Sequence, residues 1–530
     1  MTEYSADRAI SSRAEDRFNR WPFAHRLADT ISRRSEPSSL VLGIFGKWGD
    51  GKTSTMNLMI EALGVHDHVV VVPFNPWRFR SEEQLLRGFF ATLAVALDKS
   101  LQTKGEQLGG FLKRYGAVLS LASFSVASVV NLDPGSAAAK LGDALSTVEL
   151  DELRSRIETI LAASGKRIVV LIDDIDRLDR AEVQAIFKLV KLSASFSNTV
   201  YVLAFDDEMV ADALGEKYGR GGRDAGRQFL EKIIQVPLYL PAADRLTLRR
   251  LLFEGAEAAL RLSAISLDEE AGSAFAQHFM DGLEIRLVTP RQGTRYANAL
   301  TFALPILKGE VNVVDQMLLE GIRLFYPRLY TAIRDNQTVF CRRGVERHDQ
   351  QERKKSLAII EMALEDLDPD AADAARRLLQ ALFPRVKGVF GNMGYGTDWD
   401  GRWAREQRVC STHYFDRYFS YAVPLGDVPD QQLRRVIEVA AASDDRTLVE
   451  ILSDFREPAA AARLVEKLQM HAPALRPPTA PRLALAIARI GAMFPVDERV
   501  FRIGSTFVQA AVGWKVGDAQ RLSGRERPRC

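Results

Sequence analysis

The residues best suited to chemistry form a glycine-rich segment, Gly46-Lys-Trp-Gly-Asp-Gly51-Lys52-Thr53. Glycines let the backbone curl so that successive N–H groups point inward at an anion, and the following helix adds its positive N-terminus. In such a loop Lys52 would reach the β- and γ-phosphates, and the Thr53 hydroxyl would coordinate Mg²⁺. A chance match is disfavoured because an apolar strand precedes the loop and an apolar helix follows it.

The pattern therefore predicts a P-loop that binds ATP, with GTP not excluded, together with magnesium. No motif that would distinguish adenine from guanine is visible in the sequence. We expect the phosphates to contact the whole segment: Gly46, Lys47, Trp48, Gly49, Asp50, Gly51, Lys52, Thr53 and Ser54.

A P-loop needs an acidic partner at the end of a neighbouring strand, and the run Arg167–Ile172 leads into Asp173 and Asp174. Five consecutive apolar residues are typical of a buried parallel strand, whose carboxyl end is where such sheets bind ligands. We expect Asp173 to hold the magnesium, through water, and Asp174 to orient or deprotonate the attacking water. The competing interpretation is that Asp174, Asp176 and Asp179 only cap a helix.

Two further kinds of side chain are needed near the phosphates. Asp206 follows the expected strand Val200–Phe205 and could sense the γ-phosphate or position water, although capping the next helix explains it equally well. A basic residue must also offset charge on the transferred phosphoryl group. The candidates are Arg177, Arg227, Lys232 and Arg291, each of which could simply be a solvated surface residue. We favour Arg227, because its helix precedes the expected fifth strand and could lie near the site or at a subunit edge.

The elements that must position these residues alternate between short apolar runs and helical patterns. The expected strands are Leu40–Phe45, Val69–Phe74, Ile168–Ile172, Val200–Phe205 and a weaker Ile233–Leu240. Helical patterns at 82–98 and 181–193 separate them, which predicts an α/β fold with a parallel sheet covered by helices on both faces. Trp77 follows the second strand, and we expect its indole to be shielded within this domain rather than to face open solvent.

After about residue 243 the strand signals fade and long helical patterns follow. The segment 388–412, rich in glycine, tryptophan and arginine, is expected to be a loop or a small insertion. One continuous pattern is expected at 311–335. We therefore expect a helical lead-in at 1–36, a nucleotide domain at 37–243 with an insertion at about 100–150, a helical lid or extension at 244–340, a helical C-terminal domain at 341–512 and a disordered tail at 513–530.

Composition narrows the class of protein. The 530 residues are 47% hydrophobic and 26% charged, as in soluble globular proteins, and suffice for two to four domains. The net charge of +2 gives no electrostatic case for nucleic acid. Cys341, Cys410 and Cys530 show no metal-ligand spacing and are expected to be free thiols. The N-terminus lacks a signal-peptide pattern, so we expect a cytoplasmic protein.

One segment, Tyr115–Leu132, is 18 residues long and uncharged, which is long enough to span a membrane. It contains serines around much of a helix circumference, and no second segment of equal hydrophobicity follows. A single crossing between Lys52 and Asp173 would put the two halves of one magnesium site on opposite sides of a bilayer. We therefore expect this helix to pack against protein, with peripheral membrane association as the alternative.

Four phrases resemble the KAP family of P-loop NTPases over about residues 15–310: Phe74-Asn-Pro-Trp-Arg-Phe79, Ile172-Asp-Asp-Ile-Asp-Arg-Leu178, Phe229-Leu-Glu-Lys-Ile-Ile-Gln-Val-Pro237 and Thr289-Pro-Arg291. The phrase Tyr414-Phe-Asp-Arg-Tyr-Phe419 resembles the C-terminal half of bacterial members. The resemblance implies the additional-strand type of P-loop fold with a helical extension. Many members insert paired membrane helices between the two nucleotide motifs, and this chain departs from that pattern.

The resemblance further implies a switch or scaffold for protein complexes, since bacterial relatives include phage-exclusion proteins and anti-phage ATPases. We expect a magnesium-dependent ATPase that acts as a nucleotide-driven switch or assembly scaffold, with co-encoded protein partners and a homo-oligomeric state. The alternatives are a nucleic-acid-directed motor or sensor, a nucleotide-binding scaffold without turnover and, less favoured, a small-substrate kinase.

Overall fold

The computed structural model describes residues 8–79, 81–100, 109–115, 117, 152, 154–193, 196–218, 222–341, 350–391, 398–442, 444–455, 458–472, 475 and 479–490. These residues form two compact units. The sheet unit comprises Ala6–Leu248 together with the short segment Thr289–Gln292. The helical unit comprises Arg249–Val288 and the chain from Gly293 onward.

The sheet unit is built on five parallel strands: β1 (Leu40–Phe45), β2 (Val69–Phe74), β3 (Arg167–Ile172), β4 (Thr199–Phe205) and β5 (Val236–Tyr239). Their order is β2-β3-β4-β1-β5, so β4 lies between the strand that enters the P-loop and the strand that carries the acidic pair. This is the additional-strand arrangement, and the predicted α/β fold is confirmed. The fifth strand is shorter than expected, because only four of its residues pair with β1.

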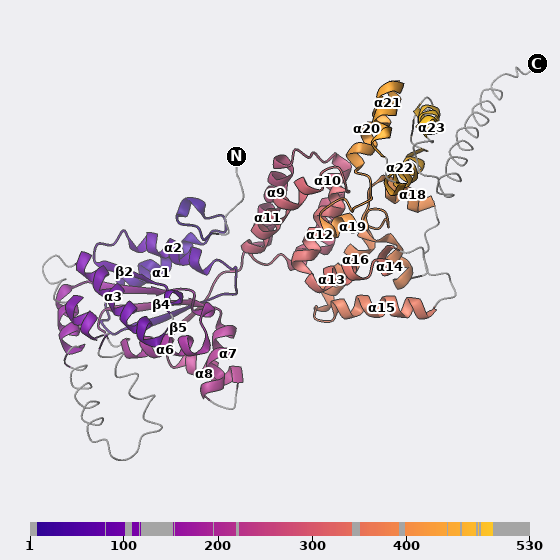
Figure 1. Cartoon of the computed structure of the whole chain (residues 1–530). Coiled ribbons are helices and arrows are strands. Elements are labelled where there is room, and N and C mark those ends of the chain that lie inside the picture. Colours follow the sequence, from indigo (N-terminus) through magenta and orange to yellow (C-terminus); the bar gives the residue numbers. More distant parts are fainter. Residues whose placement is uncertain are drawn as a thin grey trace, which may run out of the picture. The chain divides into compact units, whose positions relative to one another are not determined.

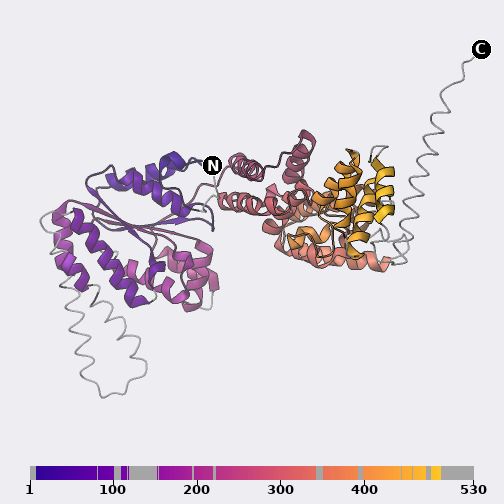
Figure 2. The same cartoon turned by 45° about the horizontal axis from the view of Figure 1, so that its top comes forward.

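Helices cover both faces of the sheet (Figure 1). The helices α1 (Trp21–Arg33) and α2 (Lys52–Leu63) pack on one face, against alternate strand residues such as Leu42 and Ile44. On the other face lie α3 (Glu82–Ser100), α6 (Arg180–Ser193) and α7 (Asp207–Tyr218), against Val41 and Phe45 among others. Figure 2 shows the strands between these two layers.

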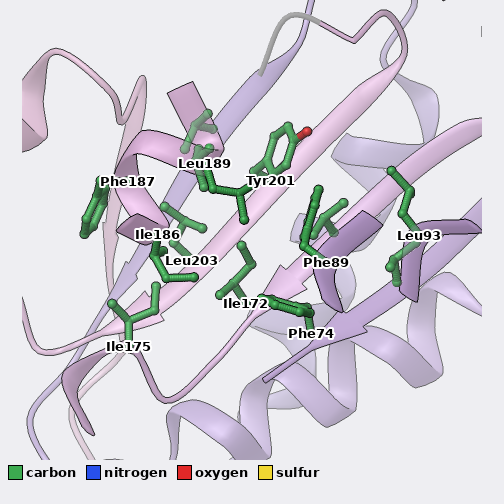
Figure 3. Close-up of a cluster of buried hydrophobic side chains, with 14 of the residues drawn as sticks. Phe74, Phe89, Leu93, Ile172, Ile175, Ile186, Phe187, Leu189, Tyr201 and Leu203 are labelled. Carbon is green, nitrogen blue, oxygen red and sulfur yellow. The ribbon is translucent and has the colours of Figure 1, made fainter. Parts of the chain in front are cut away.

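Burial on both faces explains why the strands read as continuous apolar runs. Every residue of β3 and β4 is buried. Figure 3 shows the core beneath α3 and α6, where Phe74 meets Phe89 edge to face with ring centroids 5.4 Å apart. Ile172 and Leu203, near the ends of two adjacent strands, are buried in the same cluster. The strand ends that carry the candidate site residues are therefore held in a packed core.

The helical unit is formed by helices that follow β5 in the sequence. They are α9 (Arg245–Leu262, which begins in the sheet unit), α10 (Glu269–Gly282), α11 (Pro290–Ile306), α12 (Val313–Phe325), α13 (Pro327–Asp335), α14 (Gln337–Cys341), α15 (Gln350–Leu364), α16 (Pro369–Leu382), α17 (Lys387–Phe390), α18 (Asp398–Arg405), α19 (Phe415–Ser420), α20 (Asp430–Ala441), α21 (Asp445–Ser453), α22 (Pro458–His471) and α23 (Thr479–Ile490). Buried hydroxyls are satisfied by backbone: Tyr296 donates to the Met317 carbonyl at 2.9 Å, and Tyr326 to the Gly282 carbonyl at 2.7 Å.

One sequence expectation about this unit was wrong, and a second segment that was left open between two interpretations contains a helix. The single helix expected at 311–335 is two helices, α12 and α13, because Pro327 lacks the N–H that would continue the first one. The segment 388–412, expected to be a loop or a small insertion, contains α18, whose Trp403 is buried. Glycine and tryptophan content suggested a loop, but burial of an aromatic side chain stabilises a short helix there.

A buried cluster of charges lies at α19, in the phrase that resembles bacterial family members. We call it the Arg417 cluster; its members are Glu310, Tyr414, Arg417, Asp427, Asp430 and Lys467. The Arg417 side chain is 0% exposed and forms an ion pair with Glu310 at 2.8 Å and others with Asp427 and Asp430. The Lys467 ammonium lies 3.2 Å from both aspartates. The cluster ties the loop after α11 to α19, α20 and α22.

The described helices include none that is both long enough and apolar enough to cross a bilayer. Of the segment 115–132, Tyr115 is buried, with its ring 5.0 Å from that of Phe90, and most of the remainder lies outside the described residues. The tail at 513–530 also lies outside them. Cys341 and Cys410 are free and buried, and burial raises the pKa of the Cys410 thiol to about 12.

Candidate functional site

The glycine-rich loop joins β1 to α2 at the carboxyl end of the sheet, as the sequence predicted. Gly49 and Gly51 have φ values of 93° and 94°, a conformation that strains residues with a Cβ. A Cβ on Gly49 would also lie 3.0 Å from the Cβ of Arg291. The loop is tightened from within, because the Lys47 amide donates to the Asp50 carboxylate at 2.6 Å. Two glycines are therefore needed for the curvature that turns amides toward an anion.

Lys52 is the first residue of α2 and is largely buried. Its ammonium donates to the carbonyls of Gly46, at 2.9 Å, and Lys47, at 3.4 Å. It also forms an ion pair with Asp176, 2.9 Å from one carboxylate oxygen. The lysine ammonium therefore lies beneath the loop, and each of its three N–H groups has an acceptor.

Thr53 and Asp173 meet across the two motifs. The Thr53 hydroxyl hydrogen-bonds to the Asp173 carboxylate, at the end of β3. Burial raises the pKa of Asp173, and the hydrogen bond from Thr53 offsets part of that rise. Hard oxygen donors of this kind are what Mg²⁺ binds, usually with one or two carboxylates plus waters and substrate phosphates. The residues present therefore fit a magnesium ion at this point.

Asp174 has an unusual backbone and two fixed partners. Its φ of 60° is left-handed, a region in which aspartate is among the enriched residues. One carboxylate oxygen accepts from the Asn75 amide at 2.8 Å, and the other lies 2.8 Å from Nε of Arg177. It makes no side-chain capping bond to the short helix that follows. Both carboxylate oxygens of Asp174 are therefore held in place by neighbouring side chains. Asp179, in contrast, does cap α6, because it accepts from the Glu182 amide at 2.8 Å.

Asp206 follows β4 and does cap a helix. Its carboxylate accepts from the amides of Glu208 and Met209, at 3.1 and 3.2 Å, at the start of α7. Its own amide donates to Asp176 at 3.2 Å, which connects it to the partner of Lys52. The structure therefore brings Asp206 to the edge of the site while its side chain is used for capping.

Arg227 is not among the residues that these contacts join to the P-loop. It lies on α8 (Gly222–Glu231), with a side chain 48% exposed and 3.9 Å from Glu208 on α7. Lys232, which follows α8, is exposed. The two helices pack closely, because a Cβ on Gly226 would lie 1.9 Å from the Ala211 carbonyl oxygen. Arg227 thus belongs to the outer surface of the α7–α8 pair.

Two other candidate arginines lie beside the loop and stack on tryptophans. The Arg177 guanidinium lies 4.9 Å from the ring centroid of Trp48 and 5.3 Å from that of Trp77. Arg291 lies 5.1 Å from the Trp48 ring. The expectation that Trp77 is shielded was wrong: it is 59% exposed, because Pro76 fills the buried position and Asn75 accepts from the Trp77 amide.

Sequence reasoning missed three contributors. Asn75 and Asp176 lie in two of the phrases that resemble the family, but Asn75 was given no role and Asp176 was considered only as a capping residue. Arg20 lies far from the loop in sequence, yet it is buried and donates to the Asp50 carbonyl at 3.2 Å. The loop is also held at its helix, where the Ser54 hydroxyl accepts from the Ile10 amide at 3.3 Å. Such supports come from tertiary contacts that no short motif encodes.

Comparison with known proteins gives a family match over more than half of the chain. The sequence profile of the "KAP family P-loop domain" matches residues 20–307, which include the loop, the acidic pair and Arg291.

A curated relative is the "Phage T7 exclusion protein" of Escherichia coli (strain K12), 25% identical over 352 residues. The match covers 61% of this chain and 46% of the relative, so the chain spans about half the relative's length.

Solved structures give a weaker likeness. The ORC2 protein of Aeropyrum pernix, in ADPNP and ADP complexes, is 12% identical with a TM-score of 0.29, and the match covers 70% of this chain and 94% of that one. The ORC1 protein of the same organism, in complex with DNA, is 13% identical with a TM-score of 0.29 over 70% of this chain and 84% of that one.

Proposed function

Because the chain belongs to the KAP family of P-loop NTPases, we propose that it binds and hydrolyses ATP with magnesium and uses nucleotide state to control a protein complex. The observation that carries this proposal is the meeting of the two motifs: Lys52 contacts Asp176, and Thr53 contacts Asp173. A strand-to-helix loop and an acidic strand end that converge in this way suit a phosphate and a metal ion.

Each residue has a distinct task in this proposal. The loop amides and Lys52 bind phosphate, and Thr53 with Asp173 would hold magnesium. When bound, the magnesium neutralises phosphate charge. Asp174 orients the attacking water, and Asn75 and Arg177 fix its carboxylate. We propose Arg227 as a residue that acts toward a second copy of the chain, because it lies on an exposed helix surface.

The helical unit supports a switch rather than a small-molecule enzyme. It contains its own buried aromatic core and the Arg417 cluster, neither of which belongs to the nucleotide site. We propose that this unit recruits or releases a protein partner according to nucleotide state. The likeness to a phage exclusion protein supports a role in anti-phage defence.

The test is phosphate release by the purified chain, with ATP or GTP, in magnesium or in a chelator, and with or without DNA and RNA. We expect magnesium-dependent release by the wild type and its loss in Lys52→Ala. Lys188→Ala is the matched control, because Lys188 is a surface lysine paired with Glu82. Release at the wild-type rate by Lys52→Ala would show that the assignment is wrong. Release only with nucleic acid would favour a motor or sensor.

A further inference from the structure

Asp176 stands out because, among the described residues, its carboxylate forms the ion pair with the P-loop lysine. The ion pair is 2.9 Å long, and the two side chains are only 9% and 3% exposed, for Lys52 and Asp176 respectively. A buried ion pair is far less weakened by water and salt than a surface pair. This contact therefore strongly influences whether the Lys52 ammonium pairs with Asp176 or with a phosphate.

The ammonium has no donor left for a phosphate. A lysine ammonium has three N–H groups, and those of Lys52 face the Gly46 carbonyl, the Lys47 carbonyl and Asp176. The two carbonyls belong to the loop that would enclose the phosphate. A phosphate oxygen resembles a carboxylate oxygen in charge and in hydrogen-bonding capacity, so Asp176 is the partner it would replace.

The carboxylate cannot simply move away. The same Asp176 oxygen accepts from the Asp206 amide at 3.2 Å, and the neighbouring Ile175 is 0% exposed in the core. Asp176 is therefore anchored to the end of β4 as well as to Lys52. Once Lys52 turns to a phosphate, an uncompensated negative charge remains nearby, and like charges in a dry site are costly.

We propose that Asp176 is an internal competitor for the nucleotide: its carboxylate holds Lys52 in the nucleotide-free chain and lowers the affinity for phosphate groups. This rests on the proposed nucleotide binding and deepens it, because it names a residue that sets affinity without taking part in hydrolysis. The apparent dissociation constant is the intrinsic one divided by the fraction of competent protein, so a lysine released for about a tenth of the time gives about a tenfold weaker site.

The test is the affinity of Asp176→Asn for ATP and ADP, measured by titration calorimetry in a chelator and again in magnesium. Asparagine keeps the shape and can still accept from the Asp206 amide, but it removes the charge. We expect binding about tenfold tighter than wild type in the chelator, where no metal effect can contribute. The nucleotide-free variant should unfold at a lower temperature, because Lys52 loses its partner, and ATP should raise that temperature more than in the wild type.

Asp179→Asn is the matched control. Asp179 lies three residues away and caps α6 on the surface, and the contacts described for Lys52 do not include it. Its variant should bind nucleotide as the wild type does. If Asp176→Asn does not fold, Asp176→Ser offers a smaller acceptor for the same amide and is expected to bind more tightly as well.

Unchanged or weaker binding in the chelator by the folded Asp176 variants would overturn the inference, because the carboxylate would then not compete with phosphate. Tighter binding in the chelator but weaker binding in magnesium would support the competition and add a metal-linked role. Lack of nucleotide binding by the folded wild type would instead overturn the proposed function.

Discussion

Two clusters of buried charge among the described residues, the one around Lys52 and the Arg417 cluster, show how a ligand site differs from a purely structural set of ion pairs. The Arg417 cluster is closed: Arg417 is 0% exposed and its neighbours are the side chains and carbonyls of the same unit. The cluster around Lys52 is buried at the Lys52–Asp176 pair itself but open beside it, because Trp48 of the same loop is 45% exposed and Trp77, which contacts the Asp174 partner Arg177, is 59% exposed. A closed set of matched charges leaves no position for a ligand, whereas the open set borders solvent.

The backbone does not separate the two clusters, because both contain left-handed positions. Around Lys52 these are Gly49, Gly51 and Asp174, and beside the Arg417 cluster they are Gly309, Tyr421 and Gly426. The conformation costs free energy at the residues with a Cβ, one in each set. In the Arg417 cluster, the carboxylate of Glu310 accepts from the amides of Asp430 and Gln431 at the start of α20, as an ordinary helix capping group does. Neither buried charge nor a left-handed backbone therefore identifies a functional site by itself; what distinguishes the two clusters is access to solvent.

The largest expected effect is on stability. Arg417→Ala should lower the free energy of unfolding of the helical unit by about 3–5 kcal/mol, because it removes the cation that pairs with three buried carboxylates and leaves Lys467 beside two of them. Urea denaturation followed by circular dichroism measures this. Arg402→Ala is the control, since Arg402 pairs with Glu406 on the surface and its loss should be small. Similar losses in both variants would contradict a closed, structural cluster.

A smaller but still large effect is expected on turnover. Asp174→Asn should hydrolyse ATP at least about tenfold more slowly while still binding it, because groups that handle water typically contribute ~10²–10⁴-fold. Asp173→Asn should instead weaken the magnesium dependence of binding. Asp212→Asn, which removes a carboxylate from a surface ion pair with Arg223, serves as the control. Equal and small effects at both site aspartates would reduce them to structural residues.

Asp206 should mainly affect stability. Asp206→Ala removes the cap of α7 and should lower the free energy of unfolding of the sheet unit by about 1 kcal/mol. Asp268→Ala removes the corresponding cap of α10 in the helical unit, where its carboxylate accepts from Ala271 at 2.8 Å. Phosphate release measured well below the unfolding temperature separates the roles. A loss of turnover in Asp206→Ala alone would indicate that Asp206 senses the γ-phosphate.

The smallest expected effect concerns the exposed rim. Trp77→Ala should change the free energy of unfolding by less than about 1 kcal/mol, since an exposed cation–π contact contributes ~0.5–1 kcal/mol. Acrylamide should quench a large part of the Trp77 fluorescence, given its 59% exposure. Comparing the wild type with Trp77→Phe isolates its signal. Poor quenching would mean that the indole is covered in solution.

The sequence by itself determined those parts of the protein that depend on local patterns, such as hydrophobic periodicity and motif spacing. Alternating apolar runs and helical patterns predicted the strands and the flanking helices, because burial on both faces demands continuous apolar strands. The spacing of Gly46, Gly51, Lys52 and Thr53 predicted the loop, because only that local geometry exposes amides to a phosphate. The acidic pair after β3 followed from the same logic, since the ends of parallel strands meet at one edge.

Only the tertiary structure decided which charges meet. Asn75 contacts Asp174 from the end of the adjacent strand, and Arg20 supports the loop from the position just before α1. Asp176 pairs with Lys52 from the segment that follows β3. The burial of Arg417 and the exposure of Trp77 were equally unreadable from their sequence neighbourhoods. The physical reason is that ion pairing and burial depend on residues brought together by the sheet order and helix packing, at separations where sequence periodicity carries no information.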